Sequence, residues 1–222
     1  MKRHQNKKKI QELVIKNAEE LRLVRTNIGF INRDMRSLML TSYSPAEGKS
    51  TLVACMATTY AQQNKKVLII DADFRRPTQY QKLELSNQQG LSMLLQESID
   101  AELDDFIQDT QFPNVYLLPA GPLPPNPTEL LEKNLFQQVI QETTDIFDLV
   151  LIDAPPAGIA DTQIVANIVD NVLIVVEDNR VKKAQLKQTI HVLEQANATI
   201  IGFVLNKVKR KKRSSSDYYY NY

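Results

Sequence analysis

Short runs of branched and other apolar residues recur along the chain, as expected for the strands of one sheet. The six runs are Leu38–Leu40, Val67–Ile70, Val115–Leu118, Leu149–Ile152, Val172–Val176 and Ile200–Leu205. Each is bounded by charged or turn-forming residues, which is typical of strands. Because the runs are apolar throughout rather than alternating, both faces of the sheet should be covered, which favours parallel strands.

Stretches with helical spacing of apolar residues separate these runs. They cover Leu52–Gln63, Gly90–Leu95, Leu130–Ile140, Ile164–Val169 and Ala184–Ala196. This alternation predicts an α/β fold: one doubly wound, mostly parallel sheet with helices on both faces. In such a sheet, ligands bind beyond the carboxyl ends of the strands.

The two ends of the chain differ from this pattern. Apolar residues at near-helical spacing over 10–30 predict an amphipathic helix before the first strand, which either covers its own sheet or contacts another subunit. We therefore expect a basic, disordered start over 1–9, one folded domain over 10–206, and a disordered basic linker with a tyrosine cluster over 207–222.

The formal net charge of +1 hides a segregation of charge. Residues 1–9 contain five basic side chains and residues 207–213 contain six, which leaves 16 basic and 25 acidic residues between Ile10 and Asn206, a net charge of −9. Four of the eight tyrosines follow the second basic run, at Tyr218, Tyr219, Tyr220 and Tyr222. Basic ends of this kind suggest an acidic partner, which could be nucleic acid, a membrane surface or the acidic body itself.

Cysteine content and hydropathy indicate the compartment. The single cysteine, Cys55, cannot form an internal disulfide, which suits a reducing compartment. No apolar run approaches the roughly 18 residues of a membrane span, and the basic start is followed by polar residues rather than by a signal peptide's apolar region. We expect a cytoplasmic protein without a membrane span.

The first predicted strand leads into a loop in which Gly48, Lys49 and Ser50 open a helix. This is the context of a phosphate-binding loop, in which backbone N–H groups face the phosphates, the lysine reaches the β/γ oxygens and the hydroxyl binds Mg²⁺. Tyr43 stands where the general motif has a glycine, so the full pattern is not met.

Two other predicted strands end in carboxylates. Asp71 and Asp73 follow the second strand, and Asp153 follows the fourth. An aspartate after a strand is often only a turn residue. The carboxyl ends of parallel strands share one edge, however, so these three carboxylates and Lys49 could converge on one site for a nucleotide and Mg²⁺.

The motifs SPAEGKST, IIDADFRRP, LVLIDAPP and GPLPPNPTELL together resemble the bacterial tyrosine kinases (BY-kinases) of capsule and exopolysaccharide synthesis, of the cytoplasmic CpsD/CapB-like type. The resemblance runs from Glu19 to Tyr222. It includes Glu19, Arg22 and Arg25, which are similar to the family's ExxRxxR oligomerisation motif, and the tyrosine-rich end. It implies a MinD/ParA-like P-loop NTPase fold over residues 10–206.

The resemblance also implies roles for individual residues, with ATP and Mg²⁺ as cofactors. Lys49 would contact the phosphates, and Asp71 would take the proton of the acceptor tyrosine. Asp71 and Asp73 could exchange the roles of base and Mg²⁺ ligand. Mg²⁺ would be held by Ser50, Asp73 and Asp153. The nucleotide would contact Ala46, Glu47, Gly48, Lys49, Ser50, Thr51 and Asn206.

The activity implied is that of a protein-tyrosine autokinase. Its phosphoacceptors would be Tyr218, Tyr219, Tyr220 and Tyr222 of a neighbouring subunit in a ring-shaped homo-oligomer, and it would regulate the synthesis and chain length of a polysaccharide. A separate membrane-anchored activator would recruit it to the inner face of the cell membrane through a cytoplasmic tail. Arg75 and Arg76 could neutralise phosphate charge, or be solvated, or bridge subunits.

Two other functions remain open from the sequence. A MinD/ParA-like switch ATPase would share the three strand ends, but those proteins have a signature lysine five residues before the loop lysine, where this chain has Ser44. A nucleic-acid or membrane binder could use the basic ends, but the body is acidic and the basic run lacks interleaved aromatic residues. We therefore expect no nucleic-acid partner.

Overall fold

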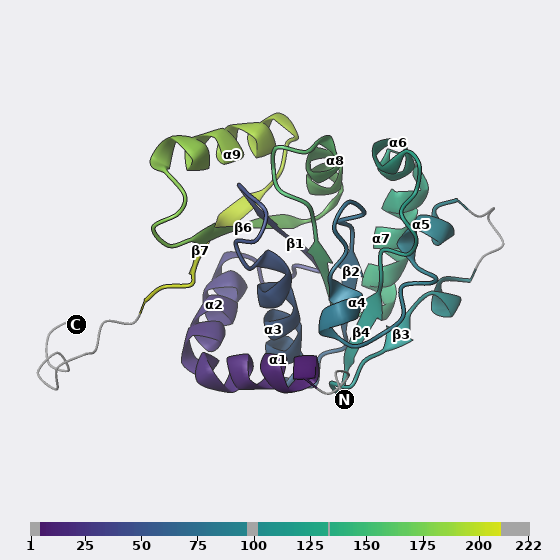
Figure 1. The fold of residues 1–222 in the computed structure, drawn as a ribbon, viewed down its shortest axis with the longest axis horizontal. Coiled ribbons are helices and arrows are strands. Elements are labelled where there is room, and N and C mark those ends of the chain that lie inside the picture. The colour runs from purple at the N-terminus through teal and green to yellow at the C-terminus, as the bar shows by residue number, and fades with distance from the viewer. Residues whose placement is uncertain (1–4, 97–101, 133, 210–222) are drawn as a thin grey trace, which may run out of the picture.

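A computed structural model describes residues 5–96, 102–132 and 134–209. Within these ranges the chain forms one seven-stranded sheet in the order β3-β4-β2-β5-β1-β6-β7, with helices on both faces (Figure 1). The strands are β1 (Ser37–Ser42), β2 (Val67–Asp71), β3 (Gln108–Asp109), β4 (Val115–Leu118), β5 (Leu149–Asp153), β6 (Asn171–Glu177) and β7 (Ile200–Asn206).

The predicted fold class is confirmed. All neighbouring strands are parallel except for the edge pair β3 and β4, which is antiparallel. Every predicted apolar run lies within a strand. The strand that the sequence pattern missed, β3, is a two-residue pair of polar residues, so it gives no apolar signal.

Each predicted helical stretch overlaps a helix, in order and with shifts at its ends, whereas two short helices, over 79–82 and 103–105, have no predicted counterpart. The helices are α1 (Gln5–Lys16), α2 (Ala18–Ile31), α3 (Lys49–Ala61), α4 (Gln79–Lys82), α5 (Leu91–Leu94), the short 3₁₀ helix η1 (Leu103–Asp105), α6 (Pro127–Leu131), α7 (Asn134–Ile146), α8 (Ala160–Ile168) and α9 (Lys183–Gln195). The stretch predicted as one helix over 130–140 is divided between α6, which begins at Pro127, and α7. Proline is favoured at the first position of a helix, where its missing N–H is not needed.

Two apolar layers cover the sheet. Leu21 of α2 and Val53 of α3 belong to the layer on one face, whereas Phe136 of α7, Val165 of α8 and Leu193 of α9 belong to the layer on the other. In Figure 1 the first group of helices lies below the sheet, α8 and α9 lie above it, and α7 lies to the right. Both faces of the central strands are therefore buried, as the uninterrupted apolar runs predicted.

The segment predicted as one amphipathic helix over 10–30 forms two helices that meet at Asn17. The Asn17 side chain and backbone N–H both donate to the carbonyl of Leu13, at 2.8 and 3.0 Å, and the backbone leaves the helix at Asn17, whose ψ is 29°. Both helices pack against the apolar layer through Val14 of α1 and through Leu21 and Ile28 of α2. They therefore cover the sheet of their own chain.

The prediction of a disordered start over 1–9 is wrong for residues 5–9, which belong to α1. The carboxylate of Glu84 accepts hydrogen bonds from the backbone N–H groups of Asn6 at 2.9 Å and Lys7 at 3.4 Å, and Asn6 donates to the Gln81 carbonyl. A carboxylate on the unpaired N–H groups of a first turn stabilises a helix. The stabilising partner lies 77 residues away in the sequence, where no local pattern reveals it.

The predicted tyrosine cluster (Tyr218, Tyr219, Tyr220 and Tyr222) lies outside the described residues, as does the basic run from residue 210 onward. None of the described helices is long and apolar enough to cross a membrane.

Candidate active site at the phosphate-binding loop

Three strand ends meet at the start of α3. In the sheet register Asp153 of β5 lies beside Asp71 of β2 on one side and beside Leu40 of β1 on the other. The loop after β1 leads directly into α3, whose first residue is Lys49. The predicted convergence of Lys49, Asp71, Asp73 and Asp153 is therefore what the fold produces.

The loop over 43–48 adopts the backbone that a phosphate-binding loop needs. Ala46 and Gly48 both have positive φ values, of 66° and 91°. Such left-handed residues alternating with ordinary ones turn successive N–H groups inward and form an anion-binding concavity. A Cβ at Gly48 would overlap the side-chain amide of Asn206, so only glycine fits there.

Three side chains hold the opposite side of this loop, where its carbonyls point outward. Arg180 donates to the carbonyl of Pro45 at 3.2 Å, Lys207 to that of Ala46 at 2.7 Å and Asn206 to that of Glu47 at 2.8 Å. We call Arg180, Asn206 and Lys207 the carbonyl brace. Lys207, predicted as the first residue of a disordered linker, is thus part of the site.

Two glutamates support the brace. Glu177 at the end of β6 accepts from Arg180 at 2.7 Å and from Lys207 at 3.0 Å, and these cations keep the pKa of Glu177 below its usual range. The side chain of Glu47 is buried and accepts from the backbone N–H groups of Ser44 at 2.6 Å and Glu177 at 3.0 Å. The side chain of Glu47 therefore fixes the loop to β6. Glu47 can bind an anion only through its backbone N–H.

Removing the two cations of the brace should weaken nucleotide binding. We expect Arg180→Met combined with Lys207→Met to raise the Kd for ADP about tenfold, since each lost hydrogen bond frees one loop carbonyl and the amides behind it lose their fixed direction. Isothermal titration measures the change. Lys187→Met, an exposed lysine on α9, is the matched control, and equal weakening in the control would contradict the role of the brace.

Lys49 lies between two carboxylates and is only 7% exposed. Its ammonium is 3.2 Å from Asp153 and 4.0 Å from Asp73. Burial by itself would lower the pKa of Lys49, but the negative charges of Asp153 and Asp73 outweigh burial and raise it. Lys49 is therefore a fixed positive charge at the mouth of the anion-binding loop.

Asp71 is fully buried and accepts only backbone N–H groups. One oxygen accepts from Thr78 and Gln79 at 3.0 Å each, and the other from Asp73 at 3.3 Å. Burial, and after it the neighbouring charge of Asp153, raises the pKa of Asp71 well above its usual range. A carboxylate with a raised pKa is better suited to accept a proton near neutral pH.

Asp73 is nearly buried and is less constrained than Asp71. One oxygen accepts the N–H of Arg76 at 3.0 Å and the other lies 4.0 Å from Lys49. Burial raises the pKa of Asp73, and the charge of Lys49 offsets part of that rise. The two aspartates of the IIDADFRRP segment therefore differ, since Asp71 is the deeper and Asp73 the one nearer to Lys49.

The chemistry of the site fits Mg²⁺ bound together with a nucleotide. Oδ1 of Asp153 is buried and has the Lys49 ammonium as an ion-pair partner but no hydrogen bond, while Ser50 follows Lys49 in the first turn of α3. Within the described ranges, no three His, Cys, Asp or Glu side chains are arranged to hold a metal ion by themselves. Mg²⁺ in nucleotide sites uses one or two protein oxygens, phosphate oxygens and water, which agrees with this sparse set.

Comparison with known proteins agrees with this geometry. A family profile described as an AAA domain matches residues 45–206. The tyrosine-protein kinase YwqD of Bacillus subtilis is 38% identical over 207 residues, 91% of this chain and 86% of its own length. The tyrosine-protein kinase CpsD of Streptococcus agalactiae is 34% identical, over 91% of this chain and 89% of its own. The chain belongs to the bacterial tyrosine-protein kinase family.

Solved structures place the kinase in the same group. The kinase domain of the Escherichia coli tyrosine kinase ETK matches with a TM-score of 0.82 at 33% identity, over 92% of this chain and 80% of that one. The chimerical protein CapA2B2 matches with a TM-score of 0.81 at 34% identity, over 86% and 85% of the chains. The cell division ATPase MinD of Pyrococcus furiosus has a lower TM-score of 0.67 at 27% identity, over 80% and 74%. The P-loop fold and this family imply nucleotide binding.

Arg75 of the kinase is tied to a residue that the sequence analysis missed. Its Nε lies 3.0 Å from the fully buried carboxylate of Asp161 in α8, which also accepts from Thr128 of the PNPTELL segment at 2.6 Å. Thr128 lies in α6, so Asp161 ties both α6 and α8 to the loop after β2. Nothing in the local sequence marks Asp161, because a single aspartate in a first helical turn is common.

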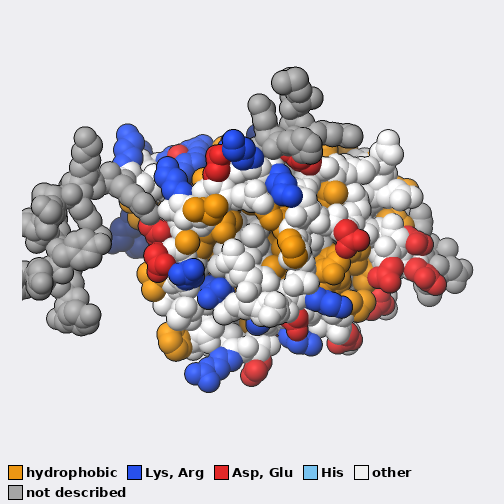
Figure 2. Space-filling view, turned by 90° about the horizontal axis from the view of Figure 1, so that it is seen from below, with side chains coloured by type: hydrophobic (Ala, Val, Ile, Leu, Met, Phe, Trp, Pro, Cys, Tyr) orange, Lys and Arg blue, Asp and Glu red, His pale blue; other side chains and the backbone are white. Residues whose placement is uncertain are grey.

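The residues of the predicted oligomerisation motif behave differently from one another. Arg22 pairs with Glu19 at 2.8 Å on the exposed side of α2, whereas Arg25 donates to the Thr59 carbonyl of α3 in the same chain. The helix that carries Glu19 and Arg22 also has the exposed apolar side chains Leu23, Phe30 and Ile31. The face of the kinase seen in Figure 2 shows several separate hydrophobic patches among lysines and arginines.

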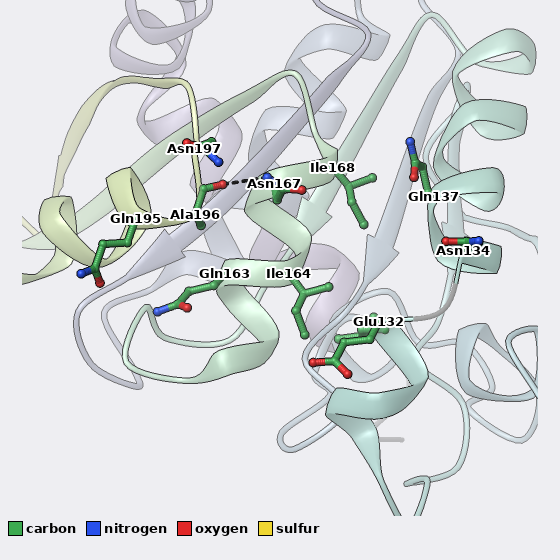
Figure 3. A pocket seen from close by; sticks show the side chains of 11 residues that line it. Glu132, Asn134, Gln137, Gln163, Ile164, Asn167, Ile168, Gln195, Ala196 and Asn197 are labelled. Atoms are coloured by element: carbon green, nitrogen blue, oxygen red, sulfur yellow. Dashed lines mark hydrogen bonds between the residues drawn. The ribbon is translucent and has the colours of Figure 1, made fainter.

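Of two pockets in the described part of the chain, one adjoins the site and one lies away from it. One, of about 660 Å³, lies between the α1–α2 corner, the start of α3 and the end of β7, and is lined by Gly48, Thr51, Asn206 and Lys207 among others. It adjoins the phosphate-binding loop on the side that Asn206 and Lys207 border. The other, of about 390 Å³, lies on the opposite helical layer among amide side chains of α7, α8 and α9 and holds none of the predicted site residues (Figure 3).

Proposed function

We propose that the protein is a tyrosine autokinase that transfers the γ-phosphoryl group of Mg-ATP to the C-terminal tyrosines of a neighbouring subunit. The observation that carries this proposal is the Lys49 ammonium held between Asp153 and Asp73 at the start of α3, with the buried Asp71 behind them. Phosphoryl transfer asks a protein chiefly for positioning and for neutralisation of charge, which this arrangement supplies.

In the proposed reaction the tyrosine oxygen attacks the γ-phosphorus, the bond to the β–γ bridging oxygen breaks, and ADP leaves. Mg²⁺, when bound, neutralises charge on the β- and γ-phosphates, with Ser50, Asp73 and Asp153 as its protein partners. Lys49 contacts the same oxygens, the loop amides of residues 46–51 cradle them, and Asn206 borders the nucleotide. Asp71 accepts the phenolic proton, for which its raised pKa is favourable.

The acceptors are Tyr218, Tyr219, Tyr220 and Tyr222, and transfer occurs between subunits of a homo-oligomer. The chain from Lys207 to the last residue has about 16 residues and can extend on the order of 50 Å, enough to reach a neighbour. Glu19 and Arg22, with the exposed apolar residues of α2, form the proposed contact between subunits.

The setting that we propose is capsule or exopolysaccharide synthesis, in which the kinase regulates polymerisation and chain length. A membrane-anchored activator would bind it through a cytoplasmic tail and hold it at the inner face of the membrane. Its similarity to the chimerical protein CapA2B2, whose name combines two components, supports a two-component arrangement.

A mixing experiment tests the acceptors and the transfer between subunits. The variant with Phe at 218, 219, 220 and 222 should bind ATP and show little autophosphorylation. When it is mixed with Lys49→Met protein, which keeps the tyrosines, phosphate should appear on the Lys49→Met chains, since one partner supplies the active site and the other the acceptors. Mass spectrometry after incubation with Mg-ATP reads the modified peptide.

The peptides of the two chains identify the outcome. Phosphotyrosine that persists at other positions of the four-Phe variant would contradict the acceptor assignment. A mixture in which the Lys49→Met chain stays unmodified, while wild-type protein is modified, would contradict transfer between subunits.

A further inference from the structure

The helix α4 brings one buried amide side chain to the edge of the active site. Gln79, its first residue, is 0% exposed. Its Nε2 donates to Oδ2 of Asp153 at 2.7 Å and to the backbone carbonyl of Ser50 at 3.0 Å. Gln79 thus links the carboxylate that ends β5 to the first turn of α3, the two elements that the proposed function uses for Mg²⁺.

The orientation of this amide follows from its neighbours. Both atoms that it contacts, a carboxylate oxygen and a carbonyl oxygen, are acceptors, so the NH₂ group must face them and the amide oxygen must point elsewhere. That oxygen, Oε1, is buried and has no hydrogen-bond partner among the described residues. Since Nε2 and Oε1 of Gln79 belong to one amide group, the unpaired Oε1 lies close to the contact with Asp153.

Gln79 has unpaired neighbours as well. In the part of the chain that the structure describes, the buried Thr78 Oγ1 neither accepts nor donates a hydrogen bond. Among the same residues, Oδ1 of Asp153 has only its ion pair with Lys49. Buried polar atoms normally have hydrogen-bond partners, so the unpaired Oε1 of Gln79 indicates a polar group that completes the site. An amide oxygen is an acceptor, so the missing group should be a hydrogen-bond donor.

The backbone holds this arrangement in place. Asp71 accepts the N–H groups of both Thr78 and Gln79 at 3.0 Å, which fixes the start of α4 against the end of β2. The backbone of Gln79 is therefore fixed beside the site, and its side chain is held by its own bonds to Asp153 and Ser50. Its position is set by the same aspartate that the proposed function uses as a base.

We propose that Gln79 is a positioning residue for Mg²⁺. Its NH₂ group fixes Oδ2 of Asp153, which leaves Oδ1 for the metal when Lys49 turns to the phosphates, and its Oε1 accepts a hydrogen bond from a water molecule on the metal. Mg²⁺ keeps several of its waters in nucleotide sites, and such waters are donors only. The inference rests on the proposed function, because it requires a bound Mg-nucleotide.

The test separates metal affinity from nucleotide affinity. The Kd of a fluorescent ADP analogue is measured with excess Mg²⁺ and with excess EDTA, and the ratio of the two values gives the gain from the metal. In Gln79→Met, which keeps the length of the side chain but has no amide, we expect this gain to fall about tenfold while the Kd in EDTA stays within about twofold, since partners of metal ligands typically contribute 10- to 100-fold to metal affinity.

A magnesium titration at saturating nucleotide should show the same shift in the half-saturating concentration. Gln81→Met is the matched control: Gln81 is an exposed glutamine on the same helix, its side chain donates to the Tyr80 hydroxyl, and the gain from Mg²⁺ in this variant should equal that of wild type. If Gln79→Met does not fold, Gln79→Asn, one methylene too short to reach Asp153, has the same expected result.

Three results would overturn the inference or its basis. An unchanged gain in the Gln79 variant refutes a role in metal binding. An equal loss with Mg²⁺ and with EDTA shows that Gln79 only supports the loop through Ser50, which also refutes the inference. Wild-type protein that does not bind the ADP analogue under either condition refutes the proposed function itself.

Discussion

Lys49→Met should abolish autophosphorylation. We expect the initial rate to fall by at least about 10³-fold, because the ammonium at the mouth of the loop neutralises charge on the transferred group and sites of this kind depend on such cations. Incubation with radiolabelled Mg-ATP, followed by measurement of incorporated phosphate, gives the rate. Lys187→Met on α9 should keep the wild-type rate.

The same substitution should change stability in the absence of nucleotide. Lys49 lies 3.2 Å from Asp153 and 4.0 Å from Asp73, and removal of one partner of a buried ion pair costs about 3 kcal/mol. The folded pKa of Lys49 is raised, so its contribution to stability is complete at all pH values below the ordinary lysine pKa. In Lys49→Met, Asp73 and Asp153 lose this positive charge and can take up protons at acid pH.

The melting temperature of Lys49→Met should therefore lie further below that of wild type at pH 8 than at pH 5. Differential scanning calorimetry without nucleotide at both pH values measures the two differences. A variant that keeps the wild-type rate of transfer would refute the placement of Lys49 on the phosphates. A loss of stability that does not vary with pH would show that Lys49 does not compensate the charges of Asp73 and Asp153.

The sequence predicted most of the sheet and the convergence of the site, for a simple physical reason. A buried parallel strand must be apolar on both faces, so β2 and β5 stand out as apolar runs, and the aspartates that follow them share one edge. The context of Gly48 and Lys49, between a strand and a helix, identified the loop although Tyr43 breaks the general motif. These signals are local, or depend only on topology.

The missed contacts act over long distances in the sequence. Arg180 and Lys207 contact loop carbonyls 135 and 161 residues away, and Gln79 contacts Asp153 across 74 residues. An exposed arginine, a lysine in a basic run and a glutamine in a polar stretch resemble ordinary surface residues. The fold alone shows that two of them hold the loop and the third is buried.

The N-terminal segment shows the same limit. Its apolar spacing predicted a helix correctly, but the corner lies at Asn17, whose side chain adds a second hydrogen bond to the Leu13 carbonyl. The start of α1 at Gln5 depends on Glu84, a partner from the turn after α4. A basic run of this kind predicts a solvated segment, although a distant carboxylate holds the first turn of α1.

Asp71→Asn should have two opposite effects, a slower transfer and a more stable fold. We expect the rate of autophosphorylation to fall about 10²- to 10⁴-fold, the usual contribution of a general base, since an amide cannot accept the phenolic proton. The amide oxygen can still accept the N–H groups of Thr78 and Gln79, so the start of α4 should stay in place. The initial rate with saturating Mg-ATP measures the first effect.

The gain in stability follows from the direction of the pKa shift. Burial raises the pKa of Asp71 in the folded protein well above its unfolded value, so the folded state binds this proton more tightly. The cost of the charged carboxylate is absent below about pH 4, grows as the pH rises from the unfolded pKa to the folded pKa, and is constant above that. Each pKa unit of difference corresponds to about 1.4 kcal/mol, or about 3–6 °C in melting temperature for a domain of this size.

The melting temperature of Asp71→Asn relative to wild type should therefore rise with pH above about 4 and then level off. Calorimetry from pH 4 to pH 9 measures this curve, and Asp145→Asn, an exposed carboxylate on α7, should give a flat one. A flat curve for Asp71→Asn would show that burial does not disfavour its charge. A rising curve with an undiminished rate would assign the proton to Asp73 instead, which lies nearer to Lys49 and less deep in the site.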